Sequence, residues 1–409
     1  MFANVSRSRL LPMSLPFRYF GAAAAFQLAA WGLLLAFSNG FVSFETGLGP
    51  VFASLHLLTL GVLAMSAIGA TLQLLPVATR QPVRALWAVK LLWWILVPGI
   101  VVFTGGAALY RPHWMGPGAV AVAVAFLIYA VLLAKNLLGA RGMPVVVLHG
   151  WAALACLVGL AATGIALVAR YEHGLDLDHA AFRNAHFVLA TYGFMGLLAI
   201  GLSGFLLPML AVAPSPPPRF SYAVLGLAVL AIVLGNALVG LAAAMGHVYL
   251  LERSLRARLR SPLGPSFLLI RASWACLLAS LALAALGFPG GTLLFGILLV
   301  PGWLLTFLLG VMQRIVPFLA SVHASTSSRG TPLISAMTPG RMLAAHRWLH
   351  LGAIALLCVS VVVEKPFVTA IAAAGGFAAA AIFAAFFVFV VVKVRRHGNA
   401  YPPSQPAPA

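Results

Sequence analysis

Long uninterrupted apolar runs are the feature that most limits how this chain can fold. They begin near Phe20 and recur along the 409 residues, and each is long enough to cross about 30 Å of hydrocarbon, which takes roughly 20 helical residues. In a bilayer the backbone polar groups must be satisfied within the protein, so such runs must form helices. Charged residues make up only 8% of the chain, too few to cover a water-soluble surface. The sequence therefore predicts an all-α polytopic membrane protein.

Pro, Gly and charged residues mark the ends of the expected helices. We expect spans at about 18–38, 50–77, 85–109, 114–138, 145–169, 181–211, 265–288, 292–319, 343–362 and 367–392. Residues 1–397 then form a single transmembrane domain, and the Pro-rich residues 398–409 are expected to be disordered. The stretch 219–260 needs a separate argument.

The positive charge of the chain indicates its orientation in the membrane. The formal net charge is +19, but the basic residues form short clusters between apolar runs instead of one patch, which argues against nucleic-acid binding. Lys and Arg are enriched in cytoplasmic loops, and the clusters recur at every second loop: Arg7 with Arg9, Arg80 with Arg84, and Lys135 with Arg141. The pattern is typical of a bacterial inner-membrane protein.

One span over 220–252 would place Arg253, Arg256 and the basic residues that follow on the wrong side of the membrane. A tight turn at Gly235-Asn236 removes this conflict, because it gives two helices at 219–235 and 237–258. The prediction is then about twelve transmembrane helices with both termini in the cytoplasm.

The pattern Gly-x7-Gly-x6-Pro occurs three times, at Gly61/Gly69/Pro76, Gly193/Gly201/Pro208 and Gly302/Gly310/Pro317. Chance would give roughly 0.2 occurrences in a chain of this composition. The copies fall on the second, sixth and tenth expected helices. This predicts a pseudo-threefold arrangement of three four-helix repeats, at about 18–138, 145–258 and 265–392. Close helix packing through small residues explains the residue types, but it does not explain the shared spacing.

Two of the three copies carry a histidine near the start of the helix. His56 lies twenty residues before Pro76, and His186 lies twenty-two residues before Pro208. With this spacing the chain resembles the catalytic-subunit superfamily of haem–copper oxidases and nitric oxide reductases. The His-x4-Gly start of the first copy is also similar to related membrane haem proteins of the nitric oxide response. The resemblance extends to residue types and spacing over about sixty residues of the motif helices. Elsewhere it is limited to the number and order of the helices.

The resemblance implies twelve helices in three four-helix arcs and haem-binding histidines on the motif helices. It also implies a copper centre with an adjacent His-His pair, but the sequence has no such dipeptide, and the third motif copy has no histidine. We therefore expect one haem b, held by His56 and His186, with Arg183 as a candidate partner for a propionate. The alternatives are interhelical hydrogen bonds for the histidines and an interfacial role for Arg183.

A second candidate site lies at the cytoplasmic ends of the spans, opposite to the ends that carry His56 and His186. His346 and His350 are four residues apart and so share one helix face, which suits a two-histidine metal site. His149 begins a span on the same side and is a third candidate ligand, for copper or a second haem. An interfacial position in the headgroup region is the alternative for all three.

We interpret the chain as a membrane haem-b protein in electron transfer, sensing or assembly linked to nitrogen-oxide or oxygen metabolism. If it is an enzyme it is an oxidoreductase, and its expected partners are the lipid bilayer and a cytochrome or other electron-transfer subunit. The rival interpretation is a secondary transporter or a metal-handling membrane protein without haem, although transporters usually show two related halves. A structural subunit that binds nothing is a third alternative.

Overall fold

The computed structural model describes residues 10–259, 263–287, 292–327 and 332–400, and these residues form helices without a strand. Ten helical segments among them are long and apolar enough to span a membrane. The α-helices are α2 (Ser14–Ala36), α3 (Pro50–His56), α4 (Met65–Thr79), α5 (Leu86–Ala108), α6 (Pro112–Leu138), α7 (Pro144–His173), α8 (His179–Val188), α9 (Leu197–Ala211), α10 (Pro218–Leu234), α11 (Ala237–Arg256), α12 (Ser266–Leu286), α13 (Thr292–Ile297), α14 (Thr306–Ser327), α15 (Gly340–Val363) and α16 (Pro366–Ala400).

Three π-helical segments, η2 (Leu57–Ala64), η3 (Leu189–Gly196) and η4 (Leu298–Leu305), and two short 3₁₀ helices, η1 (Ser38–Gly40) and η5 (Ile334–Met337), complete the fold. Large apolar side chains remain exposed on the outer helices, for example Trp87 at 69% and Leu127 at 63%. Exposed apolar patches of this extent mark contact with lipid or protein, and together with the apolar helices they identify a membrane protein.

The sequence predicts the helix boundaries closely, with two exceptions. Helix α14 runs to Ser327, and helix α16 runs to Ala400 instead of ending near 392. Residues 398–400 are therefore helical and not part of a disordered tail, whereas residues 401–409 lie outside the described residues. The basic residues Arg7 and Arg9 also lie outside them.

The expected turn between 219 and 260 is present. Gly235 ends α10 with a φ of +60°, a left-handed conformation that glycine adopts at little cost. Asn236 then caps α11, because its side chain accepts a hydrogen bond from the backbone N–H of Val239 at 3.1 Å. At the other end of α11, the N–H of Leu259 donates to the carbonyl of Val212 at 2.9 Å. The arginine-rich end of α11 therefore lies beside the end of α9.

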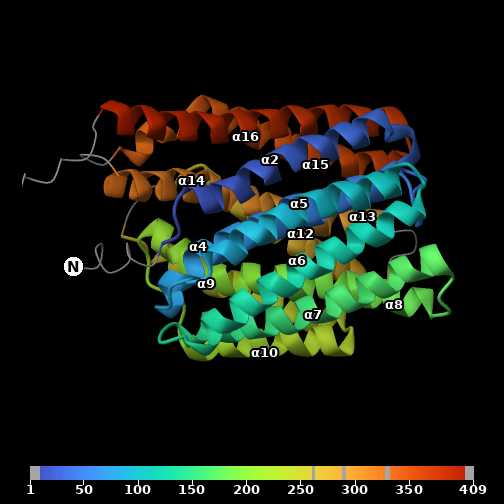
Figure 1. Ribbon diagram of the computed structural model, residues 1–409, viewed down its shortest axis with the longest axis horizontal. Helices are drawn as coiled ribbons and strands as arrows, with labels where there is room; N and C mark the ends of the chain where they lie inside the picture. The colour runs from blue at the N-terminus through green and yellow to red at the C-terminus, as the bar shows by residue number, and fades with distance from the viewer. Residues whose placement is uncertain (1–9, 260–262, 288–291, 328–331, 401–409) are drawn as a thin grey trace, which may run out of the picture.

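The motif helices lie inside the bundle. Contacts pass from α2 through α5, α6, α7, α10, α11, α12, α15 and α16 and return to α2. Figure 1 shows the long helices lying side by side along one direction. The three motif helices pack within this ring, where η2 and η3 both contact η4. In the apolar 18-residue stretch of each motif helix, between 56% and 67% of the residues are buried, compared with at most 50% in the other spans.

Each motif copy contains a π-helical segment in the same register. In η2, η3 and η4 the first motif glycine, Gly61, Gly193 or Gly302, is the fifth of eight residues. A π turn bonds residue i to i+5 and is typically found at functional sites. The shared spacing in the sequence therefore corresponds to a shared local backbone structure.

The motif glycines allow an antiparallel neighbour to pack directly on each motif helix. A Cβ atom at Gly61 would lie 2.6 Å from Phe26 on α2, and one at Gly69 would lie 2.8 Å from Tyr19. Gly193 and Gly201 contact Cys156 and His149 on α7 in the same way. Gly302 and Gly310 contact Cys276 and Leu269 on α12. The contacted residues are seven apart on α2 and on α7. On α12, Gly310 meets Ile270 at 3.0 Å as well as Leu269, seven residues before Cys276, at 3.1 Å.

We predict that Gly201→Ala destabilises the protein and that Gly204→Ala, on the same helix, does not. The new methyl group at position 201 would lie 2.5 Å from Cβ and 2.8 Å from Cγ of His149, whereas nothing lies within 4 Å at position 204. Overpacking of this kind costs about 1–3 kcal/mol. Thermal unfolding of the purified protein in detergent measures the difference. Equal unfolding temperatures for the two variants would show that the close contact is not required.

Candidate functional site

His56 is the last residue of α3 and immediately precedes η2. Its Nδ1 lies 3.0 Å from the carbonyl oxygen of Phe52, and a carbonyl can only accept, so Nδ1 carries the proton. The neutral ring then presents an unprotonated Nε2. The rings of Phe52 and Phe103 flank the imidazole at centroid distances of 4.1 and 5.3 Å and fix its orientation.

His186 lies in the last turn of α8 and reaches the neighbouring helix α7. Its Nδ1 is 3.3 Å from the hydroxyl oxygen of Thr163. That hydroxyl donates its own proton to the carbonyl of Gly159 at 2.8 Å, so His186 must be the donor in the shared bond. Its Nε2 is therefore also unprotonated. Gly164 makes room for the ring, since a Cβ there would lie 3.1 Å from Cε1 of His186.

His56 and His186 come from different motif helices. Both imidazoles are half-buried, and they lie within electrostatic range of each other. Histidine ligands of metals usually donate their second ring N–H to a carbonyl or another acceptor, which fixes the tautomer. Both rings meet this condition, so each presents an unprotonated Nε2 as a potential metal ligand. Arg183, one turn before His186, is exposed.

His346 and His350 form a second, more deeply buried group. Both side chains on α15 are fully buried, and their rings are stacked with centroids 5.9 Å apart and an interplanar angle of 2°. Gln313 donates from Nε2 to Nδ1 of His346 at 2.9 Å. His350 lies 2.8 Å from Oγ1 of Thr306. The outer nitrogens, Nε2 of His346 and Nδ1 of His350, have no partner within the described part of the chain.

The hydrogen bond of His350 has a defined direction. The hydroxyl of Thr306 donates to the carbonyl of Pro301 in η4 at 2.8 Å, so Nε2 of His350 must donate to Thr306. The π-helical segment of the third motif copy therefore positions an acceptor for a histidine on another helix. Sequence analysis gave no site role to Thr306 or Gln313, which are 1% and 2% exposed. A buried polar residue opposite a histidine on a distant helix leaves no signal in local spacing.

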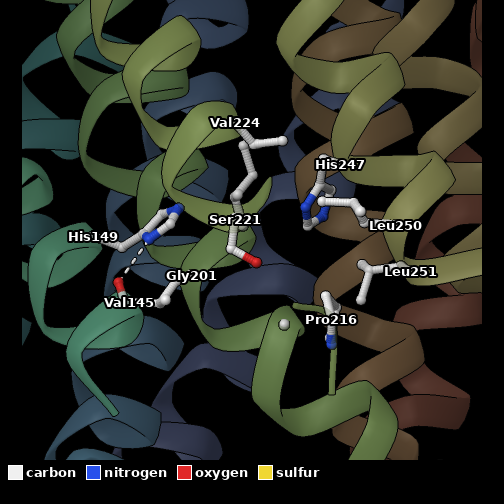
Figure 2. A pocket seen from close by; sticks show the side chains of 11 residues that line it. Val145, His149, Gly201, Pro216, Ser221, Val224, His247, Leu250 and Leu251 are labelled. Atoms are coloured by element: carbon white, nitrogen blue, oxygen red, sulfur yellow. Dashed lines mark hydrogen bonds between the residues drawn. The ribbon is translucent and has the colours of Figure 1, made fainter. Parts of the chain in front are cut away.

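His149 does not join the pair on α15. It lies on α7 against Gly201 and lines a pocket with His247 (Figure 2). The described residues contain no group of three His, Cys, Asp or Glu side chains that could hold a metal ion. The expectation that His149, His346 and His350 share one site is therefore corrected. Sequence analysis grouped the three histidines because they lie near the same ends of their membrane spans. The helices that carry them, however, face different neighbours.

The chain has three cysteines, and all of them are free. Cys156 and Cys276 pack against the motif glycines Gly193 and Gly302.

We predict that Thr306→Val lowers the free energy of unfolding by about 1–3 kcal/mol, the usual cost of leaving a buried donor unsatisfied. The group left without an acceptor is the Nε2–H of His350. Thr104→Val is the matched control, because Thr104 is equally buried and bonds only to Ile100 on its own helix. Thermal unfolding of Thr306→Val, His350→Phe and the double variant measures the coupling. Additive effects would contradict the proposed bond.

A scan against models of known protein families gives no match to this chain, and a search of curated proteins also gives none.

Proposed function

We propose that the chain is a membrane haem-b protein that transfers single electrons, with His56 and His186 as the axial ligands of one haem. The observation that supports this most strongly is the tautomer of the two rings. Each has Nδ1–H engaged, with Phe52 or Thr163, and each presents Nε2. Two neutral imidazoles are suitable axial ligands for a haem in electron transfer. A haem b held there would supply a one-electron redox centre.

The residues around the pair have complementary roles in this proposal. Phe52 and Phe103 contact the imidazole of His56 and exclude water from its sides. Arg183 is exposed at the outer end of α8, where its guanidinium suits a propionate carboxylate. A cytochrome or other electron-transfer subunit is the proposed partner, and nitrogen-oxide or oxygen metabolism is the proposed setting.

We further propose twelve membrane crossings in three units of four helices: α2 to α6, α7 to α11, and α12 to α16. The three π segments in one register and the three equivalent glycine contacts support this arrangement. Helices α10 and α11 have 17 and 20 residues, or about 26 and 30 Å at 1.5 Å per residue. They are short but sufficient for two crossings.

Charge supports cytoplasmic termini in the inner membrane of a bacterium. The basic clusters at Arg80, Lys135 and Arg256 lie at the inner ends of the proposed crossings, as the positive-inside rule requires. Most acidic residues lie at the other end: Glu45, Glu172, Asp176, Asp178 and Glu364. The sixth, Glu252, is held by a bidentate ion pair with Arg271 at 2.7 and 2.9 Å.

A transporter is less well supported. Intramembrane carboxylates are the usual groups of proton-coupled transport. Of the six acidic residues, all but Glu252 lie near helix ends or in loops on the side opposite the basic clusters, and Glu252 has a cationic partner.

We predict that His56→Ala and His186→Ala each abolish the low-spin haem spectrum while the protein still inserts and folds. Removal of either imidazole removes one axial ligand. Optical spectra of the purified variants, oxidised and dithionite-reduced, measure this. His113→Ala is the control, because His113 is exposed at the start of α6 and should keep the spectrum. If His186→Ala retains a six-coordinate spectrum identical to the wild type, the proposed pair is wrong.

We predict that a cysteine at Ala257, after α11, is protected from an impermeant thiol reagent in intact cells and reacts after the membrane is opened. Ala257 is exposed and lies among arginines, so the twelve-crossing arrangement places it in the cytoplasm. A cysteine at exposed Ala180, in the first turn of α8, should react from outside. Both variants use a background without the three native cysteines. Labelling of Ala257→Cys in intact cells would exclude the arrangement.

A further inference from the structure

A pocket lies among α7, α9, α10 and α11, away from His56 and His186 (Figure 2). The space inside it that a water molecule can occupy is about 20 Å³, which is room for about one water molecule or one small ion. Apolar side chains form most of its wall, and the polar side chains that line it are those of His149, Ser221 and His247. In Figure 2 the two imidazoles lie on opposite sides of the pocket. A mostly apolar cavity with a few convergent polar groups is the usual form of a binding site.

The hydrogen bonds fix the tautomer of His149. Its Nδ1 lies 2.8 Å from the carbonyl oxygen of Val145 and must donate to it. The side chain is 3% exposed, and its buried Nε2 has no partner among the described residues. The unprotonated Nε2 points towards the pocket in Figure 2. The arrangement matches that of His56, where Nδ1 also donates to the carbonyl four residues earlier.

His247 is fixed in the opposite tautomer. Its Nε2 lies 3.2 Å from the hydroxyl oxygen of Ser203, and that hydroxyl donates to the carbonyl of Ile200 at 2.9 Å. Nε2 of His247 is therefore the donor, and Nδ1 keeps its lone pair. The two imidazoles are also close enough to interact electrostatically. His247 thus has one nitrogen satisfied, by Ser203.

The pocket consequently offers lone pairs and almost no hydrogen-bond donors. Both imidazole N–H groups are used, and the hydroxyl of Ser221 is directed to the carbonyl of Pro217 at 3.5 Å. An anionic ligand would need donors, so this lining disfavours it. A Lewis acid is the complementary ligand, because a metal ion accepts the lone pairs of neutral imidazoles.

The equivalent places of the first motif copy contain tyrosines in place of the two histidines. Tyr19 packs on Gly69 as His149 packs on Gly201, and its hydroxyl donates to the carbonyl of Val89 at 2.7 Å. In the third copy the residue at this place is Leu269. Of these three packing positions, only the one on α7 presents a free nitrogen.

The second histidine shows the same contrast. Thr71 stands five residues before Pro76 and bonds the hydroxyl of Tyr129 at 2.9 Å, as Ser203 stands five residues before Pro208 and bonds His247. The first copy also has a pocket beside Thr71 and Tyr129, but the hydroxyl groups there satisfy each other. At these two positions the second motif copy therefore has imidazoles, whereas the first copy has tyrosines whose hydroxyl groups are already hydrogen-bonded.

We propose that His149 and His247 hold a single transition-metal ion, through Nε2 and Nδ1 respectively, and that the ion is Cu(I). Imidazole binds zinc, copper, iron and nickel ions, but no acidic side chain lines this pocket. Burying a charge without an anionic partner is costly, so the ion of lowest charge is favoured. Arg253 and Arg256 follow on α11 and disfavour a divalent ion further. This site is independent of the proposed haem.

The test is anaerobic titration of the purified full-length protein with Cu(I) in the presence of a chromogenic Cu(I) chelator as competitor. We expect one Cu(I) per chain to be held against the chelator. His247→Tyr and His149→Leu copy residues from the other motif copies, so both are compatible with the fold. Each should weaken binding by more than about 10-fold, and Ser203→Ala, which removes the partner of His247, by about 10-fold.

His346→Phe is the control, because it removes another fully buried histidine and should leave Cu(I) binding unchanged. The haem spectrum of the His149 and His247 variants should equal that of the wild type, which separates this site from the haem site. The proposal is overturned if the wild type holds no stoichiometric Cu(I), if water alone occupies the pocket, or if both variants bind Cu(I) as the wild type does. A circular dichroism spectrum and an unfolding temperature near the wild-type values exclude misfolding.

Discussion

The close approach of helices through the motif glycines is the constraint on which the rest of the structure depends. At each of three places a neighbouring helix lies so near a motif helix that a methyl group on either glycine would meet its side chains. Association of helices in lipid depends on such close packing and not on burial from water. His149 is itself one of the contacted residues, so the packing of α7 on Gly201 also determines where its imidazole lies.

Hydrogen bonding at membrane depth determines which nitrogen of each histidine is free. His56 and His149 donate to carbonyls of their own helices. The others, His186, His247 and His350, donate to Thr163, Ser203 and Thr306, whose hydroxyl protons are already directed to carbonyls. Polar groups in the hydrocarbon region need partners within the protein. Satisfying one nitrogen in this way leaves the other as a potential ligand for a metal.

The sequence predicts the helices because length, apolar composition and end signals are local properties. It also predicts the turn at Gly235-Asn236, because the basic residues that follow lie on the cytoplasmic side only if the chain crosses the membrane twice between 219 and 258. The π segments are not predicted, since the spacing of Gly61 and Pro76 reports a repeat but not its hydrogen bonding. The sequence also does not place His149 with His247, because a pocket lined by both α7 and α11 leaves no trace in the spacing of either helix.

The proposed pairing of His56 and His186 illustrates the same limit. A two-residue difference in their distances from Pro76 and Pro208 corresponds to about 200° of rotation on a regular helix of 3.6 residues per turn. Sequence alone therefore cannot decide whether the two rings share one gap. His56 and His186 both precede the π segment of their own motif helix, and the two π segments share one register. The packing of the two motif helices against each other therefore decides whether the rings share a gap.

Electron paramagnetic resonance of the oxidised wild-type protein, combined with a haem count per chain, tests the central claim most directly. Two neutral imidazoles on one iron produce a low-spin ferric signal, so the account predicts that signal with one haem b per chain. Protein purified from haem-replete cells that contains no haem, or that shows only the high-spin signal of a five-coordinate haem, would contradict it.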